Sequence, residues 1–328
     1  MEENKIVFEV KEEEQGLKLR EYLKEIQKFS GRLIRGAALS GRIEIDNKRV
    51  KLNHILKSGD VICFNLVKEE SQNITPEKMD IEVVYEDRDI VVVNKRPGVV
   101  VHPTRSYPSG TLANGLIYYF RKNGENCIVR LVSRLDMDTS GLIIVAKNQF
   151  AHMCLSRDMG SEDFEKSYIA VIHGKMREKQ GIIDLPIYRP EGDDIRRVVD
   201  KRGLRSITHY EVIEEFKDGE MLKLILKTGR THQIRVHLSH LNHPLYGDIL
   251  YGIGGDNKYI NRQALHAYKL KFPHPRGNKI LELEANLPED ISHLIKHLFY
   301  FKFGCLIVNK TILFGNNKSS YGKRNYDG

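Results

Sequence analysis

The sequence has no tryptophan, only four cysteines among 328 residues, and no hydrophobic run long enough to cross a bilayer. The cysteines lie far apart and form no Cys-x-x-Cys pair, which argues against a zinc ribbon and against a secreted disulfide scaffold. A membrane-spanning helix needs about 18 consecutive apolar residues, and the N-terminus lacks the basic and apolar segments of a signal peptide. We therefore expect a cytoplasmic protein without membrane association.

Motifs for common cofactors are also missing. The chain has no G-x-x-x-x-G-K-[ST] phosphate loop, no H-E-x-x-H zinc motif and no G-x-S-x-G nucleophile elbow. Its glycine cluster at 252–255 does not join a strand to a helix, as a dinucleotide-binding loop would. NTP hydrolysis, nicotinamide redox chemistry and zinc proteolysis are therefore disfavoured, and we expect neither a cofactor nor a bound metal.

Positive charge is in moderate excess and is unevenly distributed. Lys plus Arg number 52 against 44 Asp plus Glu, a formal net charge of +8. Residues 18–57 carry eleven bases against four acids and residues 196–205 carry five against one, whereas residues 1–14 are acidic. Clustered bases are typical of nucleic-acid binding, because phosphate contacts release condensed counterions. Charge alone leaves a merely solvated surface as an equal alternative.

The first part of the chain has the pattern of a small domain. The run Leu19–Ile26 repeats apolar residues at i, i+3, i+4 and i+7, which predicts a helix with one apolar face. Ser30 can N-cap a second helix over 31–39. Short strands are expected within 42–51 and at 61–64, where polar and apolar residues alternate between turn residues.

A polar, aperiodic stretch at 67–80 predicts a linker, beyond which the chain is rich in short β-like runs such as DIVVVNK and SYIAVIHG. Helices are predicted at 111–121 and 150–159. Because helices do not alternate regularly with strands, we expect an α+β fold with a mixed, mainly antiparallel sheet. The predicted units are an N-terminal segment, a first domain, the linker, a main domain and a basic tail, at 1–14, 15–66, 67–80, 81–295 and 296–328.

The most informative stretch is SRLDMDTSGLIIVAK at 133–147. Asp136 precedes a polar turn that leads into an apolar strand, so its carboxylate is expected to be partly desolvated and to need a cationic partner. Arg134 is one candidate partner, and Gly229–Arg235, which looks like a strand, supplies another. On local features alone, a carboxylate that only caps the turn is the simpler interpretation.

Four histidines within Thr231–His243 raise the question of a metal site. His232 and His237 would lie on opposite faces of a strand. No Cys or carboxylate except Asp248 is close enough in sequence to complete a four-ligand set. The histidines are therefore better explained as structural or RNA-facing residues.

Residues 15–66 resemble the RNA-binding domain named after ribosomal protein S4. The resemblance rests on L-R-E-Y-L, S-G-R-L-I-R, G-R-I-E-I-D-N-K-R-V and L-K-S-G-D-V-I in this order. It implies a small α/β domain with an RNA-binding surface on or beside the second helix. The basic residues expected there are Lys28, Arg32, Arg35 and Arg42.

Residues 81–290 resemble the RluA/RluD family of RNA pseudouridine synthases, in which an S4-type domain commonly comes first. The resemblance implies a pseudouridine synthase sheet with a central cleft, over the catalytic domain 81–295, and an isomerisation that needs no cofactor. Six motifs carry it: N-K-x-P-G with V-H-P (94–103), R-L-D-x-x-T-S-G (134–141), K-x-Y-x-A (166–170), T-G-R-T-H-Q-I-R (228–235), H-P-L-x-G-D (243–248) and L-H-A (265–267).

The resemblance also implies roles for individual residues. Asp136 would be the essential catalytic carboxylate, Arg235 its ion-pair partner and Tyr168 a platform against the uracil ring. Arg134 would help to hold the site open after the uridine has flipped out of its stack. The other expected substrate-binding residues are His102, Thr139, Arg230, His232, Gln233 and His266.

Two other functions use some of the same features. A non-catalytic RNA-binding or ribosome-assembly factor would be signalled by loss of the Asp or the Arg, and both are present. An S4-linked RNA methyltransferase would need a glycine-rich cofactor loop after a first strand, where this chain has Asn-Lys-Arg-Pro-Gly instead. We therefore predict a pseudouridine synthase acting on structured RNA, with large-subunit ribosomal RNA favoured over transfer RNA, as a monomer without an obligate protein partner.

Overall fold

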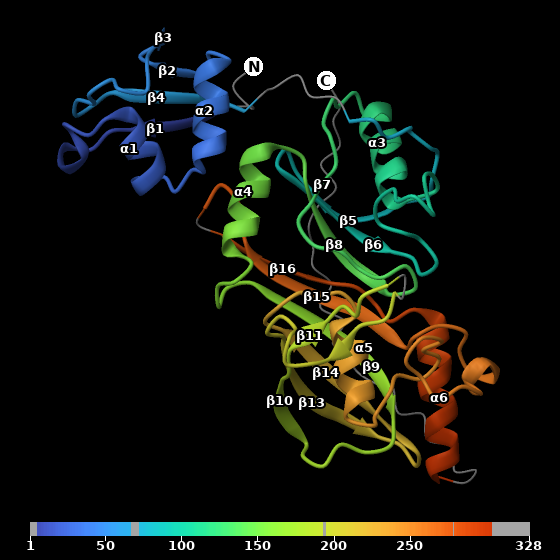
Figure 1. The fold of residues 1–328 in the computed structure, drawn as a ribbon. Helices are drawn as coiled ribbons and strands as arrows, with labels where there is room; N and C mark the ends of the chain where they lie inside the picture. Colours follow the sequence, from blue (N-terminus) through green and yellow to red (C-terminus); the bar gives the residue numbers. More distant parts are fainter. Residues whose placement is uncertain (1–4, 67–71, 193–194, 278, 304–328) are drawn as a thin grey trace.

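The protein, described by a computed structural model over residues 5–66, 72–192, 195–277 and 279–303, has a small N-terminal domain and a larger domain built on a ten-stranded sheet (Figure 1). The N-terminal domain packs two helices against four antiparallel strands in the order β1-β4-β2-β3. Its elements are β1 (Lys5–Glu9), a 3-10 turn (Glu12–Glu14), α1 (Leu19–Glu21), which continues as a π-helical turn (Tyr22–Ile26), α2 (Gly31–Leu39), β2 (Ile43–Ile45), β3 (Lys48–Arg49) and β4 (Val61–Asn65).

The two helices predicted for this domain are confirmed. The Ser30 hydroxyl accepts a hydrogen bond from the backbone N–H of Leu33 at 3.2 Å and so caps α2. The predicted apolar face of the first helical segment is buried at Leu19, Tyr22 and Leu23, while Ile26 at its end is exposed.

The N-terminal sheet begins earlier than the predicted boundary at residue 15. Strand β1 pairs with β4, from Lys5 opposite Asn65 to Glu9 opposite Val61, because its apolar residues pack onto the domain core despite the acidic sequence around them. The predicted tail begins inside helix α6 (Glu289–Phe303). Residues 67–71 of the predicted linker and residues 304–328 of the tail lie outside the described residues.

The large sheet is mixed and mainly antiparallel, as predicted. Its main path runs β10-β13-β14-β9-β15-β8-β6-β5, with β16 paired to β15 and β7 paired to β8. The strands are β5 (Glu82–Glu86), β6 (Ile90–Lys95), β7 (Arg130–Leu131), β8 (Ser140–Ala146), β9 (Glu165–His173), β10 (Gln180–Asp184), β13 (Ile207–Glu215), β14 (Gly219–Leu226), β15 (Leu265–Pro273) and β16 (Ile280–Glu284). Strands β11 (Ile187–Tyr188) and β12 (Val198–Val199) form a separate hairpin.

Each half of the large sheet is covered by a helix on both faces (Figure 1). Helices α3 (Leu112–Lys122) and α4 (Gln149–Asp158) pack on opposite faces of β6 and β8, which explains why these strands are apolar along their whole length. Helix α5 (Gln233–His240) and α6 pack on opposite faces of β9 and β14. None of the helices in the described ranges is long and apolar enough to span a bilayer.

The two halves join where β8 and β15 pair in parallel, with Ser140 opposite His266 and Gly141 opposite Ala267. Gly141 has φ +114°, and a Cβ at this position would lie 2.2 Å from the carbonyl oxygen of Ala267. Only glycine permits both this backbone conformation and this close approach. Asp136 lies immediately before this junction in the sequence, so the joint between the half-sheets also positions the predicted site.

The N-terminal domain is packed onto helix α4 of the large domain. Phe150 and Cys154 of α4 belong to the core of the N-terminal domain, and the rings of Phe29 and Phe150 lie 5.4 Å apart. From the end of β15, the guanidinium of Arg276 donates a hydrogen bond of 2.9 Å to the carbonyl oxygen of Lys5. The two domains are therefore held together by apolar packing and by a polar contact.

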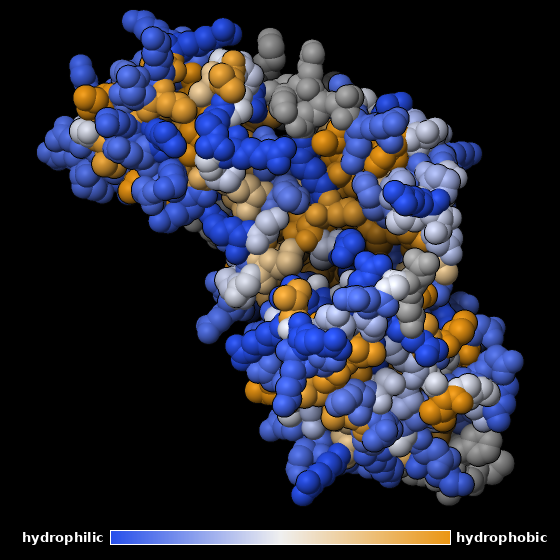
Figure 2. Space-filling view, in the orientation of Figure 1, coloured by the Kyte–Doolittle hydropathy of each residue, from blue (hydrophilic) through white to orange (hydrophobic). Residues whose placement is uncertain are grey.

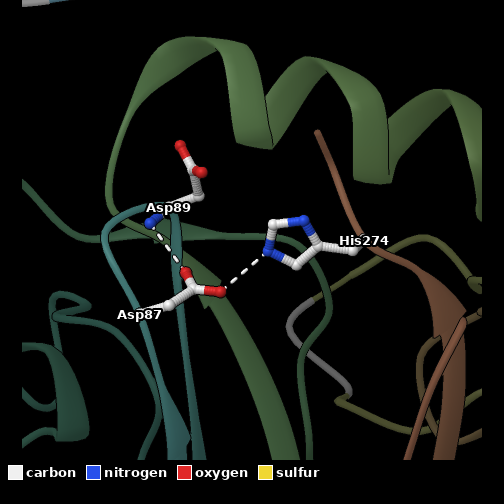
Figure 3. Close-up of side chains that lie close together, drawn as sticks. All are labelled: Asp87, Asp89 and His274. Atoms are coloured by element: carbon white, nitrogen blue, oxygen red, sulfur yellow. Dashed lines mark hydrogen bonds and ion pairs between the residues drawn. The ribbon is translucent and has the colours of Figure 1, made fainter. Parts of the chain in front are cut away.

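Arg276 belongs to a hydrogen-bonded network at the turn between β5 and β6, of which Figure 3 shows Asp87, Asp89 and His274. The Asp89 carboxylate accepts from Arg276 at 2.5 Å and from the Asn148 side-chain amide at 2.7 Å. The Asp87 carboxylate accepts from the His274 ring at 2.7 Å, from two backbone N–H groups of the turn and from a tyrosine hydroxyl. Burial alone would raise the pKa of Asp87, but these hydrogen bonds, the one from His274 first, lower it to about 2.

Gly141→Ala should destabilise the protein by about 3 kcal/mol, because the new Cβ strains the backbone and meets Ala267 at the joint of the sheet. Urea unfolding followed by circular dichroism measures the change. Gly160→Ala is the matched control, since a Cβ there meets nothing within 4 Å, and it should change stability by less than about 1 kcal/mol. Equal stabilities for the two variants would contradict the proposed role of Gly141.

Asp87→Asn should lower the free energy of unfolding at neutral pH by roughly 2 kcal/mol, the value that corresponds to a carboxyl pKa of about 2 in place of 3.8. Because the folded-state pKa is depressed, this stabilisation is present above about pH 4 and is lost as the pH falls toward 2. Denaturant unfolding of wild type and Asp87→Asn between pH 7 and pH 3 should show that the difference in their free energies of unfolding becomes smaller below pH 4. A difference that does not change with pH would contradict this role of the ionised Asp87 carboxylate.

Candidate active site

Asp136 lies in the loop that leads into β8. The loop is closed by a hydrogen bond from the backbone N–H of Thr139 to the carbonyl oxygen of Asp136, at 3.2 Å. The Asp136 side chain remains 25% exposed, so its carboxylate can be reached from solvent. Figure 2 shows hydrophobic residues in a hollow between the two halves of the large domain, edged by hydrophilic residues.

Arg235 connects Asp136 to a second carboxylate. One guanidinium nitrogen, Nη1, donates to Asp136 Oδ2 at 3.0 Å, across 99 residues of sequence. The other two nitrogens donate to the two oxygens of Asp248, Nε at 2.7 Å and Nη2 at 2.8 Å. Planar, bidentate pairing of this kind fixes both the position and the orientation of the guanidinium. The predicted pair between Asp136 and Arg235 is thus present in the structure.

The electrostatics of Arg235 follow from this geometry. Burial alone would lower its pKa, but the hydrogen bonds and negative charge of Asp248, followed by those of Asp136, raise the pKa above its ordinary value. The guanidinium is therefore a permanent positive charge beside Asp136, and it is itself largely buried.

Asp248 and Tyr251 are site residues that the sequence reasoning missed. Asp248 is buried, and its Oδ1 also accepts from the backbone N–H groups of Leu250 and Tyr251, each at 2.9 Å. The ring of Tyr251 lies 5.0 Å from the guanidinium carbon of Arg235. The H-P-L-x-G-D motif, which ends on Asp248, was the signal available. We considered this residue only as a metal ligand, because nothing local shows which cation it meets.

The strand predicted over Gly229–Arg235 is wrong: a turn leads into α5, which begins at Gln233. His232 itself has φ +56° and precedes α5. This arrangement turns Arg235 toward Asp136 and places Ile234 in the core below. A helix forms here because α5 packs on the apolar face of β9 and β14, a tertiary contact that local sequence does not reveal.

His232 is the only one of the four histidines placed beside Asp136, with Nε2 at 3.9 Å from Asp136 Oδ2 and Nδ1 at 2.9 Å from the Tyr251 hydroxyl. Burial lowers the pKa of His232, although Asp136 opposes this effect. His237 is buried and bonded to Thr208 and to the backbone of Leu185. The predicted structural explanation therefore fits His237.

Within the described part of the chain, one cluster has side chains close enough for a metal: Asp87, Asp89 and His274, shown in Figure 3. Its carboxylate oxygens already accept from Arg276, Asn148 and His274. A metal ion would have to displace the Arg276 cation, so the residues present fit a salt-bridge network better than a metal site. The cluster also lies at the opposite end of β6 from Lys95 and the Asp136 loop.

Tyr168 lies on β9, is almost fully buried and shares a hydrophobic cluster with Leu135, the residue before Asp136. Burial raises the pKa of Tyr168, and the negative charge of Asp136 raises it further. The phenol is thus less acidic than usual. The environment opposes a role for its hydroxyl as a base and leaves the ring as the useful surface.

Lys95, from the N-K-x-P-G motif, forms a hydrogen bond to the backbone of the Asp136 loop. Its ammonium donates to the carbonyl oxygens of Arg96, Val99 and Met137, at 2.9, 2.9 and 2.7 Å. Burial lowers its pKa to about 7, against the opposing charge of Asp138. Because Met137 follows Asp136 directly, Lys95 ties the motif at 94–98 to the proposed catalytic loop, a positioning role that we had not predicted.

Three predicted substrate-binding residues, Gln233, Thr139 and His266, are buried and form hydrogen bonds with other residues of the protein. Gln233 accepts from Thr228 and from the backbone N–H of Arg230, and its amide nitrogen donates to Ile207 and Thr208, so all of its polar capacity is used inside the fold. The Thr139 hydroxyl accepts from Gln263.

His266 is 1% exposed, its Nδ1 lies 2.9 Å from the Ser140 hydroxyl, and burial lowers its pKa to about 4. The structure therefore gives these three side chains contacts inside the fold, in place of the predicted direct contact with substrate. The remaining predicted contacts, His102, Arg134 and Arg230, are exposed.

The predicted basic surface of the N-terminal domain is only partly present. Lys28, Arg32 and Arg35 are exposed on or beside α2. Arg42 is buried, and its guanidinium donates to the Ser40 hydroxyl at 2.8 Å and to the carbonyl oxygen of Asn65 at 3.2 Å. Arg42 is thus a structural residue that ties α2 to β4, and its assignment to RNA binding is corrected.

Comparison with known proteins agrees with this geometry. Residues 89–240 match the family model described as RNA pseudouridylate synthase. An uncharacterized RNA pseudouridine synthase of Bacillus subtilis, YjbO, is 41% identical over 257 residues, covering 78% of this chain and 90% of that protein. The ribosomal large subunit pseudouridine synthase D of Yersinia pestis is 36% identical over 303 residues, covering 88% and 93%.

Among solved structures, human RNA pseudouridylate synthase domain containing 4 has the same fold, with a TM-score of 0.55 at 23% identity, covering 66% of this chain and 92% of that one. The sequence similarity extends over nearly the whole length of the two bacterial relatives, and the fold is shared. Both indicate the same family. The chain belongs to the RNA pseudouridine synthases, in the family of the RluA/RluD type.

Proposed function

We propose that this RNA pseudouridine synthase converts specific uridines of large-subunit ribosomal RNA to pseudouridine, with Asp136 as its essential carboxylate. One observation carries the assignment of Asp136: it is a solvent-accessible carboxylate held by a buried arginine, whose other nitrogens are fixed by a second carboxylate. Large-subunit ribosomal RNA is favoured because several relatives, at 35–37% identity, are named ribosomal large subunit pseudouridine synthases.

The chemistry fits a carboxylate without a cofactor. The bond between N1 of uracil and C1′ of ribose breaks, the base turns over, C5 bonds to C1′, and the C5 proton is replaced by one on N1. The reaction changes neither oxidation state nor atom count. Asp136 can attack the sugar, attack the base or remove a sugar proton, and in each route Arg235 would hold the carboxylate in place.

Tyr168 and Arg134 complete the proposed site. The target base would lie against the ring of Tyr168, which is held in the sheet beside Leu135. Arg134 is exposed two residues before Asp136, where its long side chain can fill the space that a flipped uridine leaves. Flipping costs a few kcal/mol, which contacts of this kind must supply.

The N-terminal domain is proposed to be an S4-type RNA-binding module. Its four-stranded sheet and two helices carry exposed bases on one helix, Lys28, Arg32 and Arg35. Because this domain is packed onto α4, it would extend the RNA-binding surface at a fixed orientation to the catalytic domain. We propose a monomer that acts in the cytoplasm, where the ribosomal substrate is found.

Asp136→Asn should lower turnover at least about 10³-fold, because the amide can supply neither the nucleophile nor the base. RNA affinity should change little, since Asp136 contributes no positive charge. Release of tritium from [5-³H]uridine-labelled ribosomal RNA measures turnover, and filter binding measures affinity. Asp218→Asn, which removes an exposed carboxylate at the turn between β13 and β14, is the control and should stay close to wild type. Wild-type turnover by Asp136→Asn would exclude this assignment.

Arg235→Lys should reduce kcat about 10²-fold with little change in RNA affinity. A lysine keeps the charge but cannot bond to Asp248 and Asp136 at three nitrogens, so the carboxylate loses its fixed orientation. Arg230→Lys, an exposed position in the preceding loop, should leave kcat unchanged. If the two substitutions affect kcat equally, the fork of Arg235 is not what positions Asp136.

A further inference from the structure

Lys166 is an unusual lysine among the buried charges of the described residues. Its side chain is on β9, and the residue is only 8% exposed. The two other buried lysines are well satisfied: Lys95 by three carbonyl oxygens, and Lys147 by the carboxylates of Glu86 and Glu125. Within the described ranges, no group accepts a hydrogen bond from the Lys166 ammonium or forms an ion pair with it; the Phe164 ring lies 6.0 Å away.

The Lys166 side chain is mostly removed from water and the described residues supply no counter-charge, which disfavours the ammonium, although Nζ itself keeps some contact with solvent. Burial correspondingly lowers the pKa of Lys166. An apolar residue of similar length at this position, such as methionine, would give a more stable fold than lysine does. An anionic partner from outside the chain would stabilise the Lys166 ammonium.

The surroundings of Lys166 show where such a partner would approach. Residues alternate along β9, so Lys166 and Tyr168 are on the same face of the sheet, about 7 Å apart along the strand. This is the face on which α5 packs. Lys166 is therefore on the face of the candidate active site, one strand repeat from the proposed uracil platform.

The loop before α5 passes close to the Lys166 ammonium at Gly229. A Cβ on Gly229 would lie 3.6 Å from Lys166 Nζ and would meet nothing else within 4 Å. Gly229 has an ordinary φ, so the backbone does not require glycine there. Any larger residue would cover Lys166 Nζ, whereas the exposed glycine leaves access from solvent.

The nearby charge indicates an anion. Lys227 and Arg230 are exposed on either side of Gly229, and the Arg230 guanidinium is held by a hydrogen bond of 3.4 Å to the carbonyl oxygen of Arg205. The exposed segment that passes Lys166 therefore carries two positive charges. An RNA backbone supplies phosphates at every nucleotide, so a nucleotide bound against Tyr168 brings phosphates close to Lys166.

We infer that Lys166 and the open backbone at Gly229 form a phosphate subsite, which binds a backbone phosphate of the RNA next to the target uridine. The inference rests on the proposed function, because it names a contact made by the same substrate. It assigns Lys166 a binding role, separate from the chemistry at Asp136.

The test compares RNA binding by Lys166→Met and Lys166→Arg in the full-length protein. Single-stranded oligouridylate is the probe, because phosphate binding does not depend on which uridine is the natural target. Lys166→Met should weaken binding about tenfold at 0.1 M salt and should reduce the slope of log K against log salt by about 0.7, the loss of one phosphate contact. Lys166→Arg should restore most of both. Lys223→Met, on the neighbouring strand and the opposite face, should change neither.

Thermal unfolding separates a binding role from a structural one. Lys166→Met should melt at the same temperature as wild type or higher, because it removes an uncompensated buried charge. An unchanged affinity and salt slope would overturn the inference. So would a lower melting temperature with no recovery by Lys166→Arg, which would make Lys166 a structural residue. Neither readout depends on turnover, so failure of the proposed function at Asp136 would be recognised separately.

Discussion

The site depends on one guanidinium group. Arg235 uses two nitrogens to grip Asp248 and the third to hold Asp136, so the position of the proposed catalytic carboxylate is set by a residue 99 positions away and by a second carboxylate beyond it. The buried Asp248 fixes the guanidinium plane, and without it a single hydrogen bond would leave Asp136 free to turn. The guanidinium also places a permanent positive charge beside the proposed catalytic carboxylate.

The large sheet brings these residues together. Asp136 is on the loop before β8 in one half, whereas Arg235 is on α5, which packs on the other half. The halves meet through the short parallel pairing of β8 and β15, where Gly141 allows the chains to approach. Lys95 then ties the end of β6 to the same loop. Small displacements at this joint would be transmitted to Asp136, since the packed sheet offers few ways to absorb them.

Much of this could be predicted from the sequence. The fully apolar run LIIVA indicated a strand covered on both faces, Ser30 indicated the start of a helix, and the motifs of the family assigned the pair between Asp136 and Arg235. Gly229–Arg235 was predicted to be a strand, whereas helix α5 begins at Gln233, because the helix depends on packing against β9 and β14. Asp248, Tyr251 and Lys95 act through partners distant in sequence, and no local pattern reveals which cation or carbonyl a buried group will meet.

Isomerisation of uridine in ribosomal RNA by way of Asp136 is the function proposed for this protein. Pseudouridine mapping of total RNA tests it most directly, in cells that lack the protein and in the same cells given back either wild type or Asp136→Asn. We expect one or a few positions of large-subunit ribosomal RNA to lose the modification and only wild type to restore it. Restoration by Asp136→Asn, or loss confined to transfer RNA, would contradict it.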